Sequence, residues 1–420
     1  MLKELSIPLF DLLQGLSSAM DLVNPALVNH HKRVAYIAHS LARELGFSRE
    51  EQNNLLVGGM LHDSGIFSLQ ERLRALQFDE AELNRHAELG YRLLNNSSLF
   101  APAAVLIRFH HVPWQNGAGK TFNGEEVPLG SHVLHLADRI AVSLAAEEPV
   151  LTQVPELTQK IAANAGETFV PELVSAFQAI AEREFFWLDI VSPFLDLVLA
   201  RLARPMSVEL DLEGMLDLTN LLSKIIDFRS PFTATHSHGV AATAEALAGL
   251  LGLSPTECHL MKIAGYLHDL GKLAVPAEIL EKPGRLTKSE FDIVKAHTFY
   301  TFRILERIPG LETINVWASF HHERLDGNGY PFHQGAAELP LGSRIVAVSD
   351  VFTALTEDRP YRSGLSSEEV AKILEGEVKK GALDGRVVDT LFSHFDEVEA
   401  MRKAAQSRAA GDFLRLTQGG

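Results

Sequence analysis

The sequence predicts an all-α protein built from two similar helical domains, and three observations support this prediction. Apolar residues recur every three or four positions, for example at Val34, Ile37, Leu41 and Leu45, which is the period of an amphipathic helix. Alternating strand patterns are scarce, and turn signals such as the Lys-Pro-Gly of residues 282–284 separate the helical segments. The third observation is an internal repeat that relates the two halves of the chain.

The repeat is visible as paired segments at nearly constant spacing. VGGMLHDSGIFS (57–68) matches IAGYLHDLGKLA (263–274), and the segment that begins with the histidine pair at 110–111 matches the one that begins at 321–322. Equivalent histidines lie 206 residues apart early in the repeat and 211 residues apart later, and its final aspartates lie 212 residues apart. We therefore expect extra residues near 278–291 and two homologous domains, residues 1–203 and 204–420.

Three segments need individual interpretation. A helix over residues 211–227 is expected to open the second domain. RIVAVSD (344–350) could pass for a short strand, but it lies among helical patterns. FFWLDIVSPFLDLVLARLA (185–203) is the most apolar segment, and because Asp189, Pro193 and Asp196 interrupt it, we expect a buried helix and not a membrane span.

Composition and charge limit the class of protein. With 420 residues, 46% of them hydrophobic, the chain can bury the cores of two or three domains. A net charge of −16 argues against duplex nucleic acid as a partner, because such binders neutralise phosphates with Lys and Arg. The single cysteine, Cys258, excludes a disulfide framework and a thiolate zinc cluster. Since no signal peptide or spanning segment is visible either, we expect a cytoplasmic protein with no membrane partner.

Each half carries a series of histidines and aspartates in the same order. One His-Asp pair is usually incidental, but a whole series that occurs twice with near-equal gaps is not. Imidazoles and carboxylates without thiolates suit iron, manganese, nickel, cobalt or catalytic zinc. The set exceeds what one tetrahedral ion needs, so it predicts two divalent ions in the second half, with an intervening carboxylate to offset their repulsion and a bridging hydroxide as nucleophile. The ligands expected there are His236, His268, Asp269, His297, His321, His322 and Asp350.

The second half resembles the HD-GYP domain, a subset of the HD metal-dependent phosphohydrolase superfamily. The motifs that carry the resemblance follow one another in order over about residues 205–400: HSHGV (236–240), LHDLGK (267–272), HHERLDGNGYP (321–331) and DVFTALTEDRPYR (350–362). This resemblance implies a phosphodiesterase that hydrolyses cyclic di-GMP, to the linear dinucleotide or on to GMP, or that linearises 3′,3′-cyclic GMP-AMP.

The resemblance also implies roles for single residues. His236, His268 and Asp350 would hold one metal ion, and His297, His321 and His322 the other, with Asp269 shared between them and catalytic. Lys272 would contact the scissile phosphate and assist catalysis, although a solvated surface lysine is the alternative. The further substrate-binding residues that it implies are Gly329, Tyr330, Arg359 and Arg362, where surface charge is the alternative for Arg362.

The glycine-rich loop after the histidine pair is expected to rim the site. Gly327, Gly329 and Pro331 predict a stiff turn that presents Tyr330 to a guanine or to a docking protein, unless the turn only caps a helix. Two positions depart from the family pattern. Phe232 replaces a glutamate that supports a third metal in some members, and Gly239 replaces a usual arginine, which could loosen a contact behind the ligands.

The first half resembles the HD superfamily but not the GYP subset, because Ile66 replaces the lysine and VPWQNGAGKTF (112–122) replaces the glycine loop. Its aligned series forms a second possible metal site: His30, His62, Asp63, His86, His110, His111 and Asp138. Three interpretations stay open. It is a degenerate metal-binding domain used for regulation or dimer contacts, a second hydrolase for a smaller phosphate ester, or metal-free packing, which buried unsatisfied imidazoles disfavour.

Two other functions for the whole chain compete with cyclic-dinucleotide hydrolysis. The first is a receptor or docking protein that binds the dinucleotide without cleaving it, which the glycine at position 239 favours weakly. The second is a nucleotidase centred on the first half. A homodimer and docking of a partner protein at the glycine loop are compatible with each of these functions.

Overall fold

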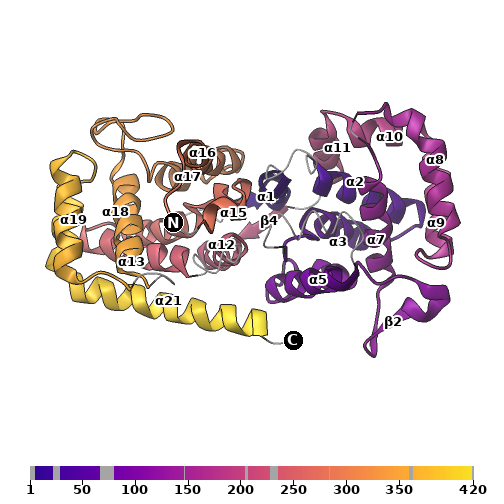
Figure 1. Ribbon diagram of the computed structural model, residues 1–420, viewed down its shortest axis with the longest axis horizontal. Coiled ribbons are helices and arrows are strands. Elements are labelled where there is room, and N and C mark those ends of the chain that lie inside the picture. The colour runs from indigo at the N-terminus through magenta and orange to yellow at the C-terminus, as the bar shows by residue number, and fades with distance from the viewer. Residues whose placement is uncertain are drawn as a thin grey trace. The chain divides into compact units, whose positions relative to one another are not determined.

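The computed structural model describes residues 5–21, 29–66, 80–145, 147–203, 207–227, 235–282, 284–358 and 363–418. The chain divides into two compact units, Pro8–Ser207 (the first unit) and Val208–Gly420 together with Met1–Ile7 (the second unit). Strand β1 (Leu5–Pro8) pairs with strand β4 (Ser207–Leu210) in a two-stranded sheet, which explains why the first residues group with the second unit. Apart from this sheet and one short hairpin, the described residues are mainly helical, as the sequence predicts (Figure 1).

The first unit is a bundle around the central helix α2 (His30–Glu44). The apolar face of α2 is fully buried, and the helix packs on α3 (Arg49–Leu61) and α7 (Leu129–Val142). A short 3-10 segment, η2 (Gln115–Lys120), leads into an antiparallel hairpin of β2 (Thr121–Phe122) and β3 (Glu125–Glu126). The other helices are α1 (Leu9–Asp21), α3 (Arg49–Leu61), α5 (Glu80–Leu94), α6 (Ala101–Arg108), α7 (Leu129–Val142), α8 (Val150–Ala163), α9 (Pro171–Ala181), α10 (Glu184–Val191) and α11 (Leu195–Leu202).

The second unit repeats this arrangement around α13 (His236–Leu250) (Figure 1). This helix packs on α14 (Pro255–Leu267), α18 (Leu341–Thr356) and the long C-terminal helix α21 (Phe395–Gln418). The predicted helix over 211–227 is confirmed as α12 (Leu212–Asp227), and RIVAVSD lies inside helix α18 (Leu341–Thr356). The remaining elements are α14 (Pro255–Leu267), η3 (Leu270–Ala274), α15 (Ala277–Leu280), α16 (Lys288–Leu305), α17 (Glu312–Ser319), α19 (Ser367–Lys379), α20 (Gly385–Ser393) and α21 (Phe395–Gln418).

Equivalent helices of the two units begin with the same capping box. At the start of α3, the Ser48 amide donates to Glu51 at 2.8 Å, while the Glu51 amide donates to the Ser48 hydroxyl at 3.3 Å. Ser254 and Glu257 repeat both bonds at the start of α14, with the same lengths. Because a cap of this kind contributes about 1 kcal/mol, it fixes where each helix starts and therefore where the His-Asp pair at its end lies.

Glycines allow the helices that carry this pair to approach their neighbours closely. A Cβ atom on Gly265 of α14 would lie 2.5 Å from the Ala241 backbone of α13, and one on Gly59 of α3 would lie 2.5 Å from the Ala35 backbone of α2. A side chain at either position would therefore push the two helices apart. The close approach brings the first histidine of each series next to the His-Asp pair.

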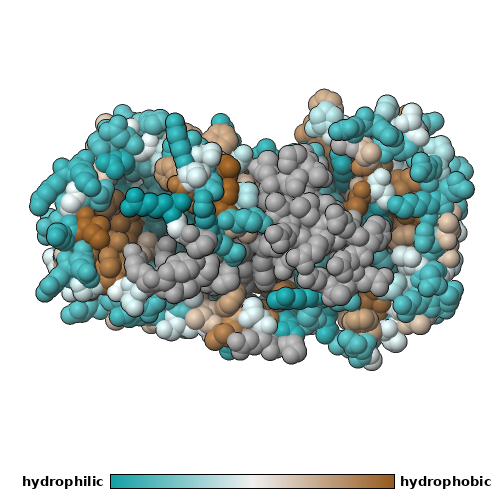
Figure 2. Space-filling view, viewed as in Figure 1, coloured by the Kyte–Doolittle hydropathy of each residue, from teal (hydrophilic) through white to brown (hydrophobic). Residues whose placement is uncertain are grey.

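The prediction of one buried helix over residues 185–203 is wrong. The segment forms two helices, α10 and α11, that separate around Pro193, because proline cannot donate the backbone bond that would continue the first helix. Each helix has a buried and an exposed side: Trp187 and Leu199 are buried, whereas Leu188 and Leu197 are exposed. Within the described residues, no helix is both long and apolar enough to cross a bilayer. The surface visible in Figure 2 is mostly hydrophilic, with small separate apolar areas.

Candidate metal centres in two HD domains

The second unit brings the seven predicted donors together from five parts of the fold. His236 begins α13, the pair at 268–269 follows α14, His297 lies in α16, the pair at 321–322 follows α17, and Asp350 lies in α18. Their donor atoms form three groups that are compact enough to hold an ion. These groups are His236, His268 and Asp350; His297, His321 and His322; and His268, Asp269 and His321.

The distances place Asp269 between the other two groups. One Asp269 oxygen lies 3.1 Å from His268 Nε2, and the other lies 3.4 Å from His297 Nε2. Asp350 Oδ1 lies 3.0 Å from His236 Nε2 and 4.0 Å from His268 Nε2. The carboxylate of Asp269 therefore faces both groups at once, as a bridging ligand must.

Backbone carbonyls set the tautomer of several of these histidines. The Nδ1 atom of His268 donates to the Gly265 carbonyl at 2.8 Å, and His297 and His321 make the same bond to the residue three positions earlier, at 2.6 Å each. A hydrogen on Nδ1 leaves the lone pair on Nε2, which is the atom that points into the cluster. These imidazoles are thus oriented as metal ligands.

The electrostatics of the second unit also fit a cation. Burial lowers the pKa of His297 and His322 to about 3, so both imidazoles are neutral and can ligate. Burial opposes ionisation of Asp269, yet His268 and Lys272 hold the pKa of that carboxyl well below its usual range. Within the described residues, the buried Nε2 of His268 has no hydrogen-bond partner. A buried lone pair that faces two carboxylates is satisfied by a divalent ion.

Lys272 lies directly at the predicted bridging aspartate. It sits in η3, half-buried, and its Nζ lies 2.5 Å from Asp269 Oδ2. Burial opposes its charge, but Asp269 raises the pKa of Lys272, so the side chain stays an ammonium. A Cβ atom on Gly271 would lie 1.9 Å from the His297 carbonyl oxygen, so only glycine lets η3 lie against α16 at this point. Lys272 is thus paired with Asp269 and is not a solvated surface lysine, and the phosphate contact stays a prediction.

Sequence reasoning missed a group of side chains behind His236. Glu357 is buried and lies 3.1 Å from His236 Nδ1, while Gln406 of α21 donates to the same carboxylate at 3.2 Å. The glycine at position 239 makes room for this contact, because a Cβ atom there would lie 2.9 Å from Gln406 Nε2. Burial opposes protonation, but Glu357 and Asp350 raise the pKa of His236 to about 10, because these two carboxylates favour positive charge at this position. A metal ion bound to His236 would take the place of that proton. The loosened contact expected from Gly239 is therefore not observed, because α21 fills the space.

The glycine loop lies beside the histidine pair and is held by a buried carboxylate. Glu323 accepts hydrogen bonds from the amides of Phe332 at 2.6 Å and Gln334 at 3.0 Å. A Cβ atom on Gly329 would lie 2.4 Å from the Glu323 backbone, so the turn closes only with glycine. The Tyr330 ring lies 5.0 Å from the His322 ring, so it borders the site. The predicted contacts Arg359 and Arg362, and Phe232, lie outside the described residues.

The first unit also brings its predicted series together. Two groups of donors are compact enough for an ion: His30, His62 and Asp63; and His86, His110 and His111. The facing Nε2 atoms lie 3.2 Å apart in the pair His30 and His62, and 3.0 Å apart in the pair His86 and His111. Asp138 Oδ1 lies 3.4 Å from His30 Nε2. All seven side chains are buried, and within the described residues the Nε2 of His110 has no hydrogen-bond partner, which fits a metal centre here too.

Two neighbours distinguish the first centre from the second. Arg139 bonds Asp138 through both Nε and Nη2, whereas Val351 follows the equivalent Asp350. Sequence reasoning also missed His31, which is fully buried, bonds Asp21 through Nδ1 and turns Nε2 to within 3.8 Å of Asp63. The doubled histidine at 30–31 was the available signal for it.

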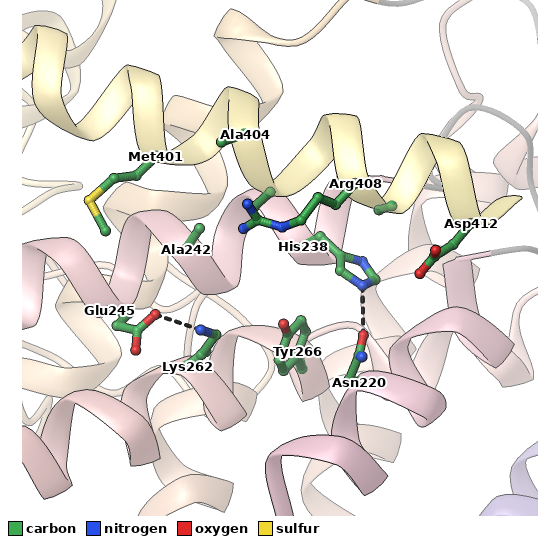
Figure 3. Close-up of a pocket in the computed structure, with 12 residues that line it drawn as sticks. Asn220, His238, Ala242, Glu245, Lys262, Tyr266, Met401, Ala404, Arg408 and Asp412 are labelled. Atoms are coloured by element: carbon green, nitrogen blue, oxygen red, sulfur yellow. Dashed lines mark hydrogen bonds and ion pairs between the residues drawn. The ribbon is translucent and has the colours of Figure 1, made fainter. Parts of the chain in front are cut away.

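A separate pocket of about 420 Å³ lies in the second unit between α12, α13, α14 and α21 (Figure 3). It is lined by His238, Lys262, Tyr266 and Arg408, among others. His238 lies two positions after His236, which is about 200° around the helix, so the pocket and the candidate metal centre use different sides of α13. No predicted metal ligand lines the pocket.

Comparison with known families finds an HD domain twice, over residues 27–143 and over residues 220–387. Fold and donor series together thus define a tandem HD-domain protein. The 3′3′-cGAMP-specific phosphodiesterase 1 of Vibrio cholerae is 33% identical over 392 residues, which cover 90% of this chain and 89% of that protein. The phosphodiesterase 3 of the same name and species is 28% identical, covering 88% of this chain and 91% of that protein.

Shorter matches join the second unit to a further group of enzymes. A cyclic di-GMP phosphodiesterase of Thermotoga maritima is 39% identical over 163 residues, 38% of this chain and 44% of that protein. The crystal structure of a V. cholerae cyclic GMP-AMP specific phosphodiesterase, V-cGAP3, has the same fold, with a TM-score of 0.63 at 24% identity over 93% of this chain and 98% of that one. The chain belongs to the HD-GYP family of cyclic-dinucleotide phosphodiesterases.

Proposed function

We propose that the second unit hydrolyses a phosphodiester bond of a cyclic dinucleotide, with 3′,3′-cyclic GMP-AMP preferred over cyclic di-GMP, and releases the linear dinucleotide. The observation that carries the proposal is the convergence of two groups of metal-type donors on Asp269, with the Lys272 ammonium 2.5 Å from that carboxylate. The preference for the mixed dinucleotide rests on the names of the two relatives that match nearly the whole chain.

Each donor group has a role in this proposal. His236, His268 and Asp350 would hold one divalent ion, iron, manganese or a similar metal, and His297, His321 and His322 a second, with Asp269 shared. When bound, such ions supply Lewis acidity to the phosphate and lower the pKa of water, so that a nucleophile exists at neutral pH. The protein itself orients the imidazoles through their Nδ1 bonds and excludes bulk water by burial.

Lys272 is the protein's own cation at this site. Its ammonium would hold a phosphate oxygen and stabilise the charge that develops on the leaving oxygen, an interaction that strengthens in the transition state. Tyr330 and Gly329 border the site on the loop side and would contact a base. Arg359 and Arg362 stay predictions for phosphate or guanine contacts.

The test is a hydrolysis assay with purified full chain loaded with Mn²⁺ or Fe²⁺ and offered both cyclic dinucleotides at equal concentration. We expect linear product, formed faster from 3′,3′-cyclic GMP-AMP, and no product with Asp269→Ala. Asp63→Ala is the matched control in the first unit and should keep the activity. Tight binding with no product over hours, metal present, would instead identify a receptor and contradict the proposal.

The first unit is proposed to hold metal as well, through the six donors of its two groups and Asp138, which lies 3.4 Å from His30. It lacks the lysine and the glycine loop of the second unit, so we propose a regulatory or structural centre and not a second cyclic-dinucleotide hydrolase. Mononucleotide hydrolysis that is lost with His62→Ala and kept with His268→Ala would overturn this assignment. Homodimer formation and docking at the loop of residues 327–331 stay predictions, which light scattering and pull-down with a loop variant would test.

A further inference from the structure

His31 of the first unit lies against the candidate metal centre, although the repeated donor series does not include it. The side chain is fully buried in α2, and its Nδ1 bonds Asp21 Oδ1 at the end of α1. Because the carboxylate accepts this bond, the hydrogen is on Nδ1 and the lone pair is on Nε2. A carboxylate that orients an imidazole in this way is the usual arrangement behind a metal-ligating histidine.

The free nitrogen of His31 faces an oxygen that is also an electron-pair donor. Nε2 lies 3.8 Å from Asp63 Oδ2, and within the described residues it has no hydrogen-bond partner. Two buried lone pairs that face each other repel, and a cation between them removes that repulsion. Metal bonds to nitrogen and oxygen ligands are about 2.0–2.2 Å long, so two ligands of one ion lie at most about 4.3 Å apart. The separation of 3.8 Å therefore fits a shared ion.

In the second unit, a lysine side chain supplies the positive charge beside the equivalent aspartate. There the Lys272 ammonium lies 2.5 Å from an oxygen of Asp269, the residue equivalent to Asp63. The residue equivalent to Lys272 in the first unit is Ile66. The second unit has no histidine at the position of His31, because the equivalent residue is Ser237. The Ser237 hydroxyl donates at 2.7 Å to Asp227, which is the counterpart of Asp21. One unit thus has the lysine without the histidine, and the other has the histidine without the lysine.

We propose that the first unit binds an additional divalent cation between His31 and Asp63, in the position that the Lys272 ammonium takes in the second unit. One imidazole and one carboxylate suit manganese, iron, cobalt or zinc. The inference rests on the proposed metal centre of the first unit, because Asp63 belongs to both. With this additional ion, the first unit would bind more metal ions than the second unit. The ion would lie beside Asp63, whereas in the second unit the Lys272 ammonium lies beside the equivalent Asp269.

The test measures metal content in the full chain. The second centre is disabled with Asp269→Ala and His321→Ala, the protein is dialysed to equilibrium against Mn²⁺, and bound metal is counted by mass spectrometry. We expect His31→Ala to bind one equivalent less than this parent. Ile66→Lys, which supplies the missing ammonium, should also bind one equivalent less, while Asp21→Asn should weaken the affinity for that one ion by about 10–100-fold.

A second measurement keeps the result independent of folding. Each variant is melted in chelator, where its unfolding temperature must match that of the parent, and is then titrated with Co²⁺, whose visible spectrum reports the ligands. If His31→Ala and Asp21→Asn keep the metal content, affinity and Co²⁺ spectrum of the parent, the inference is wrong. If His62→Ala leaves the parent's metal content unchanged, the first-unit centre itself is absent, and the wider proposal fails for a separate reason.

Discussion

The two units hold the same donor series in the same helical frame, and they differ in what surrounds it. In the second unit, the carboxylates face histidines and one lysine, and Asp350 contacts His236 at 3.0 Å. In the first unit, Arg139 takes one oxygen of Asp138, an aliphatic side chain occupies position 66, and a short hairpin replaces the glycine loop. From this comparison we expect the donors to decide whether a metal ion can bind, and their neighbours to decide whether a substrate phosphate meets a lysine ammonium beside the metal site.

The largest contrast is expected at the bridging aspartates. Asp269→Ala removes the carboxylate shared by both donor groups, so hydrolysis of the cyclic dinucleotide should fall about a thousand-fold or more, to background, since metal assistance supplies several kcal/mol. Asp63→Ala changes the equivalent residue of the first unit and should leave the rate within about threefold of wild type. Initial rates of linear product formation measure both. Equal losses in the two variants would show that both centres take part in one reaction.

Lys272→Ala should have the next largest effect. Losing one preorganised cation that acts in the transition state lowers kcat by about 10²–10³, with bound metal unchanged and KM changed less. Lys262→Ala is the matched control, because Lys262 pairs with Glu245 away from the metal ligands. Steady-state kinetics together with metal analysis separate the two effects. A variant that lost its metal along with its activity would assign Lys272 a purely structural role at Asp269.

Glu357→Gln should have a smaller effect that acts through metal affinity. The carboxylate orients His236 from behind, and partners of this kind are worth about 10–100-fold in affinity. Titration of the apo-protein with Mn²⁺, followed by dialysis and metal counting, gives the shift, and activity should return at high Mn²⁺. Glu245→Gln serves as the control and should bind metal normally. Activity that stays low at saturating Mn²⁺ would mean that Glu357 does more than hold its histidine.

The smallest expected effect concerns Arg139 of the first unit. Arg139→Val gives this position the residue that follows the aspartate in the second unit, and it frees both oxygens of Asp138 for a cation. The first-unit affinity for Mn²⁺ should then rise by less than about tenfold, since the guanidinium lost is one competing charge among several. Metal titration with the second centre disabled measures the change. Weaker binding in this variant would show that Arg139 positions Asp138 and does not compete for it.

The sequence predicted the helical class and the donor series well, because both are periodic and local signals. His268 and His297 lie where their helices place them, and the repeat made a chance origin of the series unlikely. The contacts behind the ligands were not predictable, because they join residues far apart in the sequence. Glu357 bonds His236, which lies 121 positions earlier, and Gln406 of α21 bonds Glu357. The half-exposed helices of residues 185–203 were not predictable either. Which face of an apolar helix is covered depends on the elements that pack against it, and the segment's own sequence does not specify them.

The space left by Gly239 lets helix α21 support a residue that orients a predicted metal ligand. Arg402 bonds the backbone of Thr356 at 3.4 Å and Gln406 bonds Glu357, so helix α21 braces the carboxylate that aims the first histidine of the second unit. A stop codon ahead of Arg402 would remove both contacts and uncover part of α13, which packs on α21. Proteins shortened in this way should therefore bind metal more weakly in the second unit, and a C-terminal affinity tag should follow Gln418 so that α21 stays whole.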